Sequence, residues 1–257
     1  MAQENRSVLQ TLAFGLLCCI VLARSDLFKS VVVEVGFHQY AEFVDPTTTL
    51  KMPFNALVNL GYIAVGIRWL NFPQRKKLSP EMIHYFEMFA TMSIFYGPVQ
   101  FLRIISQNRL FAILDQWLTL PIFMWASLFG LFCLSRKPHS TSENLLLLMS
   151  LSSYGLVFLS KVGFEIALGI HIIFAVLVGV TCQWKIGTKQ SLQYMIIAIL
   201  CCLGFVVLKI YDLELGKKHW VFKRVSGHFL SKVCDIFQID MVARFFMELL
   251  LNKSKRM

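Results

Sequence analysis

The sequence lacks the short motifs that mark the best-known catalytic sites. It contains no H-E-x-x-H zinc-binding helix, no G-x-S-x-G nucleophile turn and no phosphate-binding P-loop. No apolar segment carries a row of like-charged residues, which excludes a voltage-sensor helix. Charged residues make up only 16% of the chain, against about 25% in a typical soluble domain. The sequence therefore gives no sign of these enzyme classes and little material for a water-exposed surface.

Cysteine pairs are also missing. The chain has no C-x-x-C motif, and all seven cysteines lie inside apolar segments, at Cys18, Cys19, Cys133, Cys182, Cys201, Cys202 and Cys234. A disulfide framework normally has its cysteines in the loops of a small secreted domain. We therefore expect free thiols packed as small apolar groups, and no native disulfide.

Apolar residues, in contrast, are abundant. The chain of 257 residues is 56% hydrophobic with a mean hydropathy of +0.62, and its apolar residues gather in long runs. Such runs are typical of helices that cross a membrane. The net charge of +10 is compatible with nucleic-acid binding, but Lys and Arg lie in short clusters between the apolar runs. That distribution is typical of cytosolic loops beside anionic headgroups, so we expect membrane lipids as partners and no nucleic acid.

Eight apolar segments predict eight membrane spans. The first ends at Arg24, and we interpret it as a retained span because no clear cleavage site follows; a cleaved signal peptide is the alternative. We expect an all-α integral membrane protein, a bundle of about eight transmembrane helices that forms a single polytopic domain over residues 1–257. One N-terminal helix precedes a seven-helix core over residues 52–251. The predicted spans are residues 8–24, 52–71, 82–103, 110–134, 144–160, 164–183, 193–211 and 226–251.

Ionisable residues in the last span predict a polar interior. In a helix, His228, Lys232 and Asp235 lie at i, i+4 and i+7 and share one face. Charged groups are costly in hydrocarbon, so this face should turn into the bundle. The three residues could serve as metal ligand, acid and base, or ion path. Alternatively, Lys232 could simply pair with Asp235 while His228 lies at the interface.

Other spans offer partners for this face. The predicted polar cavity consists of Asn55, Asn59, Gln100, Arg103, Asp115, His228, Lys232 and Asp235. The two asparagines are expected to make interhelical hydrogen bonds. Arg103 either joins the cavity or extends to the headgroups. Asp115 needs a cation or a donor, and a purely structural ion pair is its alternative role.

We predict one specific contact in this cavity, a buried ion pair between Asp115 and Lys232. An unpaired charge at membrane depth costs roughly 2.5–3.5 kcal/mol on insertion scales. Asp235, three residues from Lys232 on the same helix, is the competing partner. Asn55 or Asn59 is expected to hydrogen-bond to the pair.

Several longer strings resemble one family. They are M-P-F-N-A-L-V-N from Met52, Y-G-P-V-Q from Tyr96, L-D-Q-W-L-T-L-P-I-F from Leu114, G-F-E from Gly163, C-L-G-F-V-V-L-K from Cys202, and G-H-F with S-K-V-C-D within residues 227–235. Together they span almost the whole chain and are similar to the transmembrane protein 187 family. The resemblance implies a multi-pass membrane protein of the Golgi region and implies no particular reaction.

The order of polar residues is also similar to that of the alkaline ceramidase and progestin–adipoQ receptor superfamily of seven-helix membrane hydrolases. Asn55 with Asn59, Asp115, and His228 followed by Lys232 match three of its polar elements. Three histidines hold a zinc ion in that superfamily. Here the end of the second core helix, where the superfamily has its His, offers Gln100 and Arg103 instead, and Lys232 replaces the second His of the last helix. One His and one Asp do not make the three protein ligands of a catalytic zinc, so we expect no metal and no other cofactor.

These features favour a non-enzymatic multi-pass membrane protein whose cavity binds a lipid or a protein partner. Its expected location is the Golgi or trans-Golgi network, with another endomembrane or the plasma membrane as alternatives. One alternative function is a divergent hydrolase of a lipid amide or ester, with His228 as general base and Asp115 as its orienting partner; only this alternative would involve zinc. Another is an ion or proton pathway through Asp115, Lys232 and Asp235.

The basic cluster Arg75, Lys76 and Lys77 predicts the membrane orientation. It is the densest basic loop closely flanked by two predicted spans, and such loops face the cytosol. With eight spans, both termini then also face the cytosol. A protease site inserted at Lys77 should be cleaved from the cytosolic side of sealed vesicles. Cleavage only from the lumen would indicate the opposite orientation. In that orientation the basic loop at residues 213–225 would face the cytosol, which the charge rule also favours.

Overall fold

The computed structural model describes residues 4–24, 26–135 and 140–254, and these residues form helices, turns and loops with no strand. The α-helices are α1 (Glu4–Arg24), α2 (Pro53–Leu57), α3 (Leu60–Leu70), α4 (Pro80–Ser106), α5 (Arg109–Ser135), α6 (Ser140–Ser153), α7 (Gly163–Ile186), α8 (Lys189–Ile210), α9 (Asp212–Lys218) and α10 (Gly227–Ser254). Short 3-10 turns cover Asp26–Ser30, Phe37–Gln39, Pro73–Lys77, Tyr154–Phe158 and Trp220–Lys223.

Helix covers most of each of the eight predicted spans, although the second is interrupted and the fifth passes from α6 into the 3-10 turn Tyr154–Phe158. Four helices, α4, α5, α7 and α8, are long and apolar enough to cross a membrane, and α1 contains a shorter apolar stretch, Ser7–Ala23. At 28 residues α10 is long enough, but it carries several charged residues along its length. The all-α membrane class is therefore confirmed, whereas the number of eight spans stays a prediction.

The second predicted span is broken into α2 and α3. The break falls at Val58 and Asn59. The Asn59 side-chain amide donates to the backbone carbonyls of Asn55 (2.8 Å) and Ala56 (3.1 Å). An Asn side chain that bonds to nearby backbone offers the chain an alternative to the helical ladder. The interruption of the helix therefore involves Asn59, a residue that the sequence analysis assigned to the predicted polar cavity.

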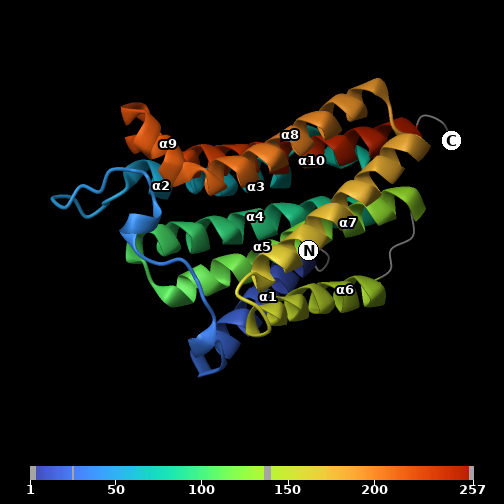
Figure 1. Cartoon of the computed structure of the whole chain (residues 1–257). Coiled ribbons are helices and arrows are strands. Elements are labelled where there is room, and N and C mark those ends of the chain that lie inside the picture. The colour runs from blue at the N-terminus through green and yellow to red at the C-terminus, as the bar shows by residue number, and fades with distance from the viewer. Residues whose placement is uncertain (1–3, 25, 136–139, 255–257) are drawn as a thin grey trace.

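The helices pack in a bundle around α4 and α5 (Figure 1). On one side, α3 packs along α4, and α8 packs on α10. On the other side, α6 and α7 flank α5, while α1 lies against α4 and α5. The consecutive helices α7 and α8 diverge from their joint at Gly187 and Thr188, because α7 follows α5 and α8 follows α10.

Aromatic side chains fill the interior between these layers. Trp69 stacks on Phe86 with ring centroids 5.6 Å apart, and Phe129 stacks on Phe246 at 4.3 Å. Each such pair contributes about 0.5–1.5 kcal/mol beyond its buried area. These contacts join α3, α4, α5 and α10 into one core.

A glycine allows α3 and α4 to approach closely beside the predicted cavity. A Cβ atom at Gly97 would lie 2.9 Å from the Asn59 carbonyl oxygen. Small residues at such contacts are typical of helices packed within membranes. The close approach places Asn59 beside the turn of α4 that leads to Gln100.

The segment between α1 and α2 lies across one end of the bundle, together with α2 and α9 (Figure 1). In the structure, the Ala41 N–H donates to the Asp212 carboxylate at 2.9 Å, and the Phe43 N–H donates to the Lys223 carbonyl at 2.6 Å. These bonds fasten the segment to α9 and the turn that follows α9.

Candidate functional site

The eight residues predicted to line a cavity are all buried and come from four helices. Each has an exposed fraction of 8% or less. We call this group the polar core, and it lies at the bundle end that carries α2 and α9. Its members are Asn55 and Asn59 of α2 and the break after it, Gln100 and Arg103 of α4, Asp115 of α5, and His228, Lys232 and Asp235 of α10.

Asp115 has the most polar partners in this group. The Tyr96 hydroxyl donates to its Oδ1 at 2.7 Å, and the Gln100 side-chain amide donates to the same oxygen. Arg103 forms an ion pair with Oδ2. Tyr96, Gln100 and Arg103 lie at i, i+4 and i+7 and so share one face of α4. One helix face therefore holds both oxygens of the carboxylate.

The predicted ion pair between Asp115 and Lys232 is wrong, because Arg103 pairs with Asp115 instead. Only Gln107 and Asn108 join α4 to α5, so the chain reverses there and the first turns of α5 face the last turns of α4. Arg103 thus meets Asp115 across a tight hairpin and needs no distant helix. Arg103 is 6% exposed, so the alternative in which it extends to the headgroups is also wrong.

Lys232 lies among aromatic rings. Its ammonium nitrogen is 5.7 Å from the ring centroids of Tyr96 and Phe205 and 6.0 Å from that of Tyr62. Asp235, its competing partner, accepts a hydrogen bond from the Tyr62 hydroxyl. Among the ion pairs of the described residues, none includes Lys232. Cation–π attraction from three helices is therefore the contact that holds this ammonium.

Neither Asn55 nor Asn59 forms a hydrogen bond with the Arg103–Asp115 ion pair. Asn55 Oδ1 accepts a hydrogen bond of 3.0 Å from the Ser226 hydroxyl, just before α10 begins. Asn59 donates to the backbone of its own turn. The expectation that one of them bonds to the Asp115 pair is therefore wrong. Asn55 instead ties α2 to the start of α10.

His228 does not meet Asp115. Its ring packs edge-on against Tyr40, with centroids 4.8 Å apart, and no hydrogen bond joins it to Asp115 in the described parts of the chain. No three His, Cys, Asp or Glu residues of residues 4–24, 26–135 and 140–254 are grouped so that they could hold a metal ion. The residues present thus fit neither the zinc of the resembled hydrolases nor a His–Asp catalytic pair.

Five side-chain atoms of the polar core are buried without a hydrogen-bond partner. They are Asn55 Nδ2, Asn59 Oδ1, Gln100 Oε1, Arg103 Nε and His228 Nε2. Buried polar atoms in proteins are nearly always paired, with protein or with ordered water. Five such atoms on residues of α2, α4 and α10 make this region unlike an ordinary packed interior.

Comparison with known proteins identifies the family. The model of the TMEM187 protein family matches residues 8–247. The protein named Transmembrane protein 187 from Bos taurus is 41% identical, over 97% of this chain and 99% of its own length. Its namesake from Homo sapiens is also 41% identical, over 88% of this chain and 86% of its own length. This chain belongs to the TMEM187 protein family. No solved structure matches it.

Together with the apolar helices, the TMEM187 relatives establish a membrane protein. The sequence analysis missed two tyrosines that bond to residues of the polar core. Tyr96 lies four residues before Gln100, and Tyr62 lies three residues after Asn59, so each shares a helical face with a predicted residue. That spacing was the available signal. It was overlooked because a tyrosine in an apolar run is usually a packing residue.

Two carboxylates outside the spans fasten the end of the bundle over the polar core. Glu42 accepts the backbone N–H groups of Phe54 and Asn55 at the start of α2. Asp212 accepts the backbone N–H of His228 at the start of α10. Burial raises the pKa of both carboxyls. Negative groups at helix N-termini are favourable, so each residue stabilises the first turn of a helix that bears polar-core residues.

The ion pair between Asp115 and Arg103 yields a test by double-mutant cycle. Asp115→Asn and Arg103→Met should each lower the free energy of unfolding in detergent by about 3–5 kcal/mol, because each leaves one buried charge alone. The double variant should lose clearly less than the sum of the two. Asp115→Asn combined with Lys232→Met is the comparison and should show the smaller coupling. A larger coupling energy between Asp115 and Lys232 than between Asp115 and Arg103 would instead support the Asp115–Lys232 ion pair.

Proposed function

We propose that this protein is a non-enzymatic multi-pass membrane protein that binds the polar part of a membrane lipid in its polar core. The observation that carries the proposal is the set of five buried polar atoms without partners. Each such atom costs about 1–3 kcal/mol when it is left unpaired. A lipid headgroup or linkage, together with bridging water, would supply the missing hydrogen bonds.

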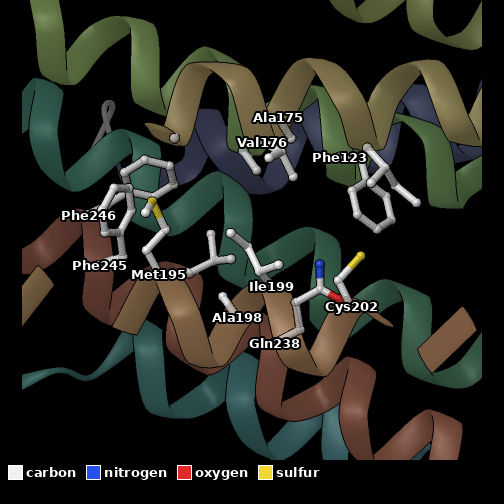
Figure 2. A pocket seen from close by; sticks show the side chains of 14 residues that line it. Phe123, Ala175, Val176, Met195, Ala198, Ile199, Cys202, Gln238, Phe245 and Phe246 are labelled. Atoms are coloured by element: carbon white, nitrogen blue, oxygen red, sulfur yellow. The ribbon is translucent and has the colours of Figure 1, made fainter. Parts of the chain in front are cut away.

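An apolar pocket next to the polar core offers space for the chain of such a lipid. It lies between α5, α7, α8 and α10, and Figure 2 shows the amide of Gln238 pointing into it among apolar side chains. Gln238 follows Asp235 by three residues, and Cys202 of the pocket precedes Phe205 by three. Since Phe205 contacts the Lys232 ammonium, this end of the pocket is about one helical turn from the polar core.

The pocket is located where a chain from the bilayer can reach it. Its lining comes in part from α7 and α8, which diverge from their joint (Figure 1), and Figure 2 shows these side chains. Leu177 of α7 and Leu200 of α8 are each 60% exposed, so the outer faces of both helices are apolar and suit contact with hydrocarbon. Along α8 the lining runs from Met195 to Cys202, about 10 Å at the helical rise. That length suits part of one acyl chain.

The same geometry favours binding over hydrolysis. Asp115 is engaged by donors from α4, and within the described residues no hydrogen bond joins the His228 ring to a carboxylate that could orient it as a base. A lipid is favoured over a protein partner because apolar side chains make up nearly all of the pocket lining. The ion or proton pathway through Asp115, Lys232 and Asp235 stays an alternative.

Filling the pocket should reduce lipid binding. Gly179 of α7 lines the pocket, and a Cβ atom added there would meet nothing within 4 Å. A leucine at this position should occupy the space of the chain. Gly179→Leu should therefore lower the amount of lipid that stays bound through purification about tenfold, equivalent to about 1.4 kcal/mol. Native mass spectrometry of the detergent-solubilised protein measures the retained lipid.

The matched control is Gly169→Leu. Gly169 lies on the same helix, also has nothing within 4 Å of an added Cβ, and is not among the pocket residues. This variant should retain lipid like the unchanged protein. Equal retention by both variants would contradict the pocket, and no retained lipid on the unchanged protein would contradict lipid binding itself.

We also propose a Golgi location, with the trans-Golgi network foremost. The support is the resemblance of the sequence strings to the family, which implies that region. A tagged protein expressed at low level should overlap with a trans-Golgi marker in fluorescence microscopy. Overlap with a plasma-membrane marker instead would contradict the location without affecting the binding proposal.

A further inference from the structure

A groove at the bundle end opposite α9 carries charged residues that do not belong to the polar core. It lies between the end of α3, the start of α8 and the last turns of α10, and its volume is about 530 Å³. The joint between α7 and α8 and the end of α10 lie together at this end (Figure 1). We call it the end groove, and its lining includes Arg68, Gln190, Tyr194, Arg244 and Glu248.

A buried carboxylate positions the two arginines of the end groove. Asp240 is 5% exposed and accepts the Trp69 indole N–H at 2.9 Å. The same carboxylate forms ion pairs with Arg68 at 3.1 Å and with Arg244 at 2.8 Å. Arg68 also lies over the Trp69 ring, and Arg244 lies over the Tyr194 ring. Two guanidinium groups, one from α3 and one from α10, are thus held at one carboxylate and line one groove.

Most N–H donors of these guanidinium groups remain available to a ligand. A guanidinium carries its donors in a planar fork that matches phosphate oxygens. Arg68 contacts Asp240 through one Nη, and Arg244 contacts it through Nε, with one more donor engaged by Tyr194. The Arg68 side chain is 53% exposed, so its fork is accessible from the groove. An anionic oxygen here would meet two groups that are already oriented.

An acidic residue lies one helical turn farther along α10. Asp240, Arg244 and Glu248 follow each other in steps of four residues and share a face of the helix. Glu248 is therefore about 6 Å beyond Arg244 along the helix axis. Its carboxylate has a long contact of 3.4 Å with the Thr188 hydroxyl, and no ion pair formed within the described residues includes it. This carboxylate can therefore receive a cation from a ligand.

The order of these charges matches a zwitterionic lipid headgroup. In a phospholipid the acyl chains point to the bilayer centre, the phosphate follows, and the ammonium lies outermost. Phe237, seven residues before Arg244 on α10, is 55% exposed, and Ile67 of α3 is 51% exposed. Toward the bundle end, apolar surface is thus followed by the arginines and then by Glu248. With Asp240, the site holds two positive and two negative groups, so a ligand with one charge of each sign keeps it neutral.

The end groove also lies at the level expected for headgroups. Gln190 and Tyr194 belong to the first turns of α8, and Trp184 in the last turn of α7 is 86% exposed. Trp and Tyr are enriched where a membrane meets water. Lys185 and Lys189 flank the joint between the two helices. This end of the bundle therefore has the composition of an interface with lipid headgroups.

We propose that the end groove binds the headgroup of phosphatidylethanolamine. The phosphate oxygens accept hydrogen bonds from Arg68 and Arg244. The primary ammonium donates to the Glu248 carboxylate and to Oε1 of Gln190, whose amide nitrogen is already bonded to the Tyr194 hydroxyl at 2.9 Å. This site is independent of lipid binding in the polar core, because it lies at the other end of the bundle.

Two other common headgroups fit the end groove less well. Choline has no N–H donor for Glu248, and it is attracted instead by open aromatic faces. The Tyr194 ring is already covered by Arg244. A serine headgroup adds a carboxylate, which Glu248 repels. The acceptors beyond the arginines therefore select a primary ammonium without a second acid.

Thermal unfolding of the full chain in nanodiscs tests the ligand. Discs of phosphatidylcholine are the reference, and adding phosphatidylethanolamine should raise the melting temperature by about 5 °C. Its monomethyl and dimethyl derivatives should give progressively smaller gains, because each methyl group replaces one N–H donor. No gain, equal gains across the methylated series, or an equal gain from phosphatidylserine would overturn the assignment. A full gain from soluble phosphoethanolamine in phosphatidylcholine discs would overturn the lipid as its source.

Two groove variants and one control assign the gain to these residues. Arg68→Gln and Glu248→Gln should each reduce the gain from phosphatidylethanolamine to less than half. Arg68→Gln leaves Asp240 bonded to Trp69 and Arg244, so the fold is retained. The control Glu81→Gln removes an exposed carboxylate in the first turn of α4, outside the end groove, and should keep the full gain.

A full gain in both groove variants would show that phosphatidylethanolamine acts through the bilayer alone and would overturn the inference. The outcome is separable from the proposed function. Gly179→Leu should keep the full gain, because its pocket shares no residue with the end groove. Absence of the gain together with normal lipid retention would therefore overturn only the end-groove site.

Discussion

The structure of the polar core depends on one carboxylate, Asp115, held by a single face of α4. Tyr96, Gln100 and Arg103 approach it at successive turns, so the contact fixes the rotation of α4 relative to α5. A buried carboxylate without such partners would be costly at membrane depth. With this contact made within one hairpin, the charges of α10 are left without their expected partner.

This arrangement links the fold to the proposed binding. Since Arg103 satisfies Asp115, Lys232 projects among aromatic rings rather than toward a carboxylate. The Gln100 amide, which helps to hold the hairpin, also has one end bonded and one end free. Consequently the polar core combines rigid support with unused hydrogen-bonding capacity. A site with these properties suits selective binding better than proton transfer.

The incorrect ion pair shows where sequence reasoning stopped. Helical spacing correctly placed His228, Lys232 and Asp235 on one buried face, because periodicity along a helix is a local property. It could not decide which cation faces Asp115, since that depends on how two helices are rotated and joined. The short link between α4 and α5 made Arg103 the nearer partner. A search for basic residues within one turn of a tight helix–helix link would have found it.

By itself the sequence determined the all-α membrane class, the helical segments and the burial of the eight polar residues. These follow from composition, apolar run length and the cost of placing charge in hydrocarbon. Tertiary structure alone decided the pairing of Arg103 with Asp115, the aromatic surroundings of Lys232 and the pocket beside Gln238. Each of these depends on how the helices are rotated and joined, which decides the side chains that compete for the same partners. Such competition is settled by distances between helices, which no pattern along a single helix contains.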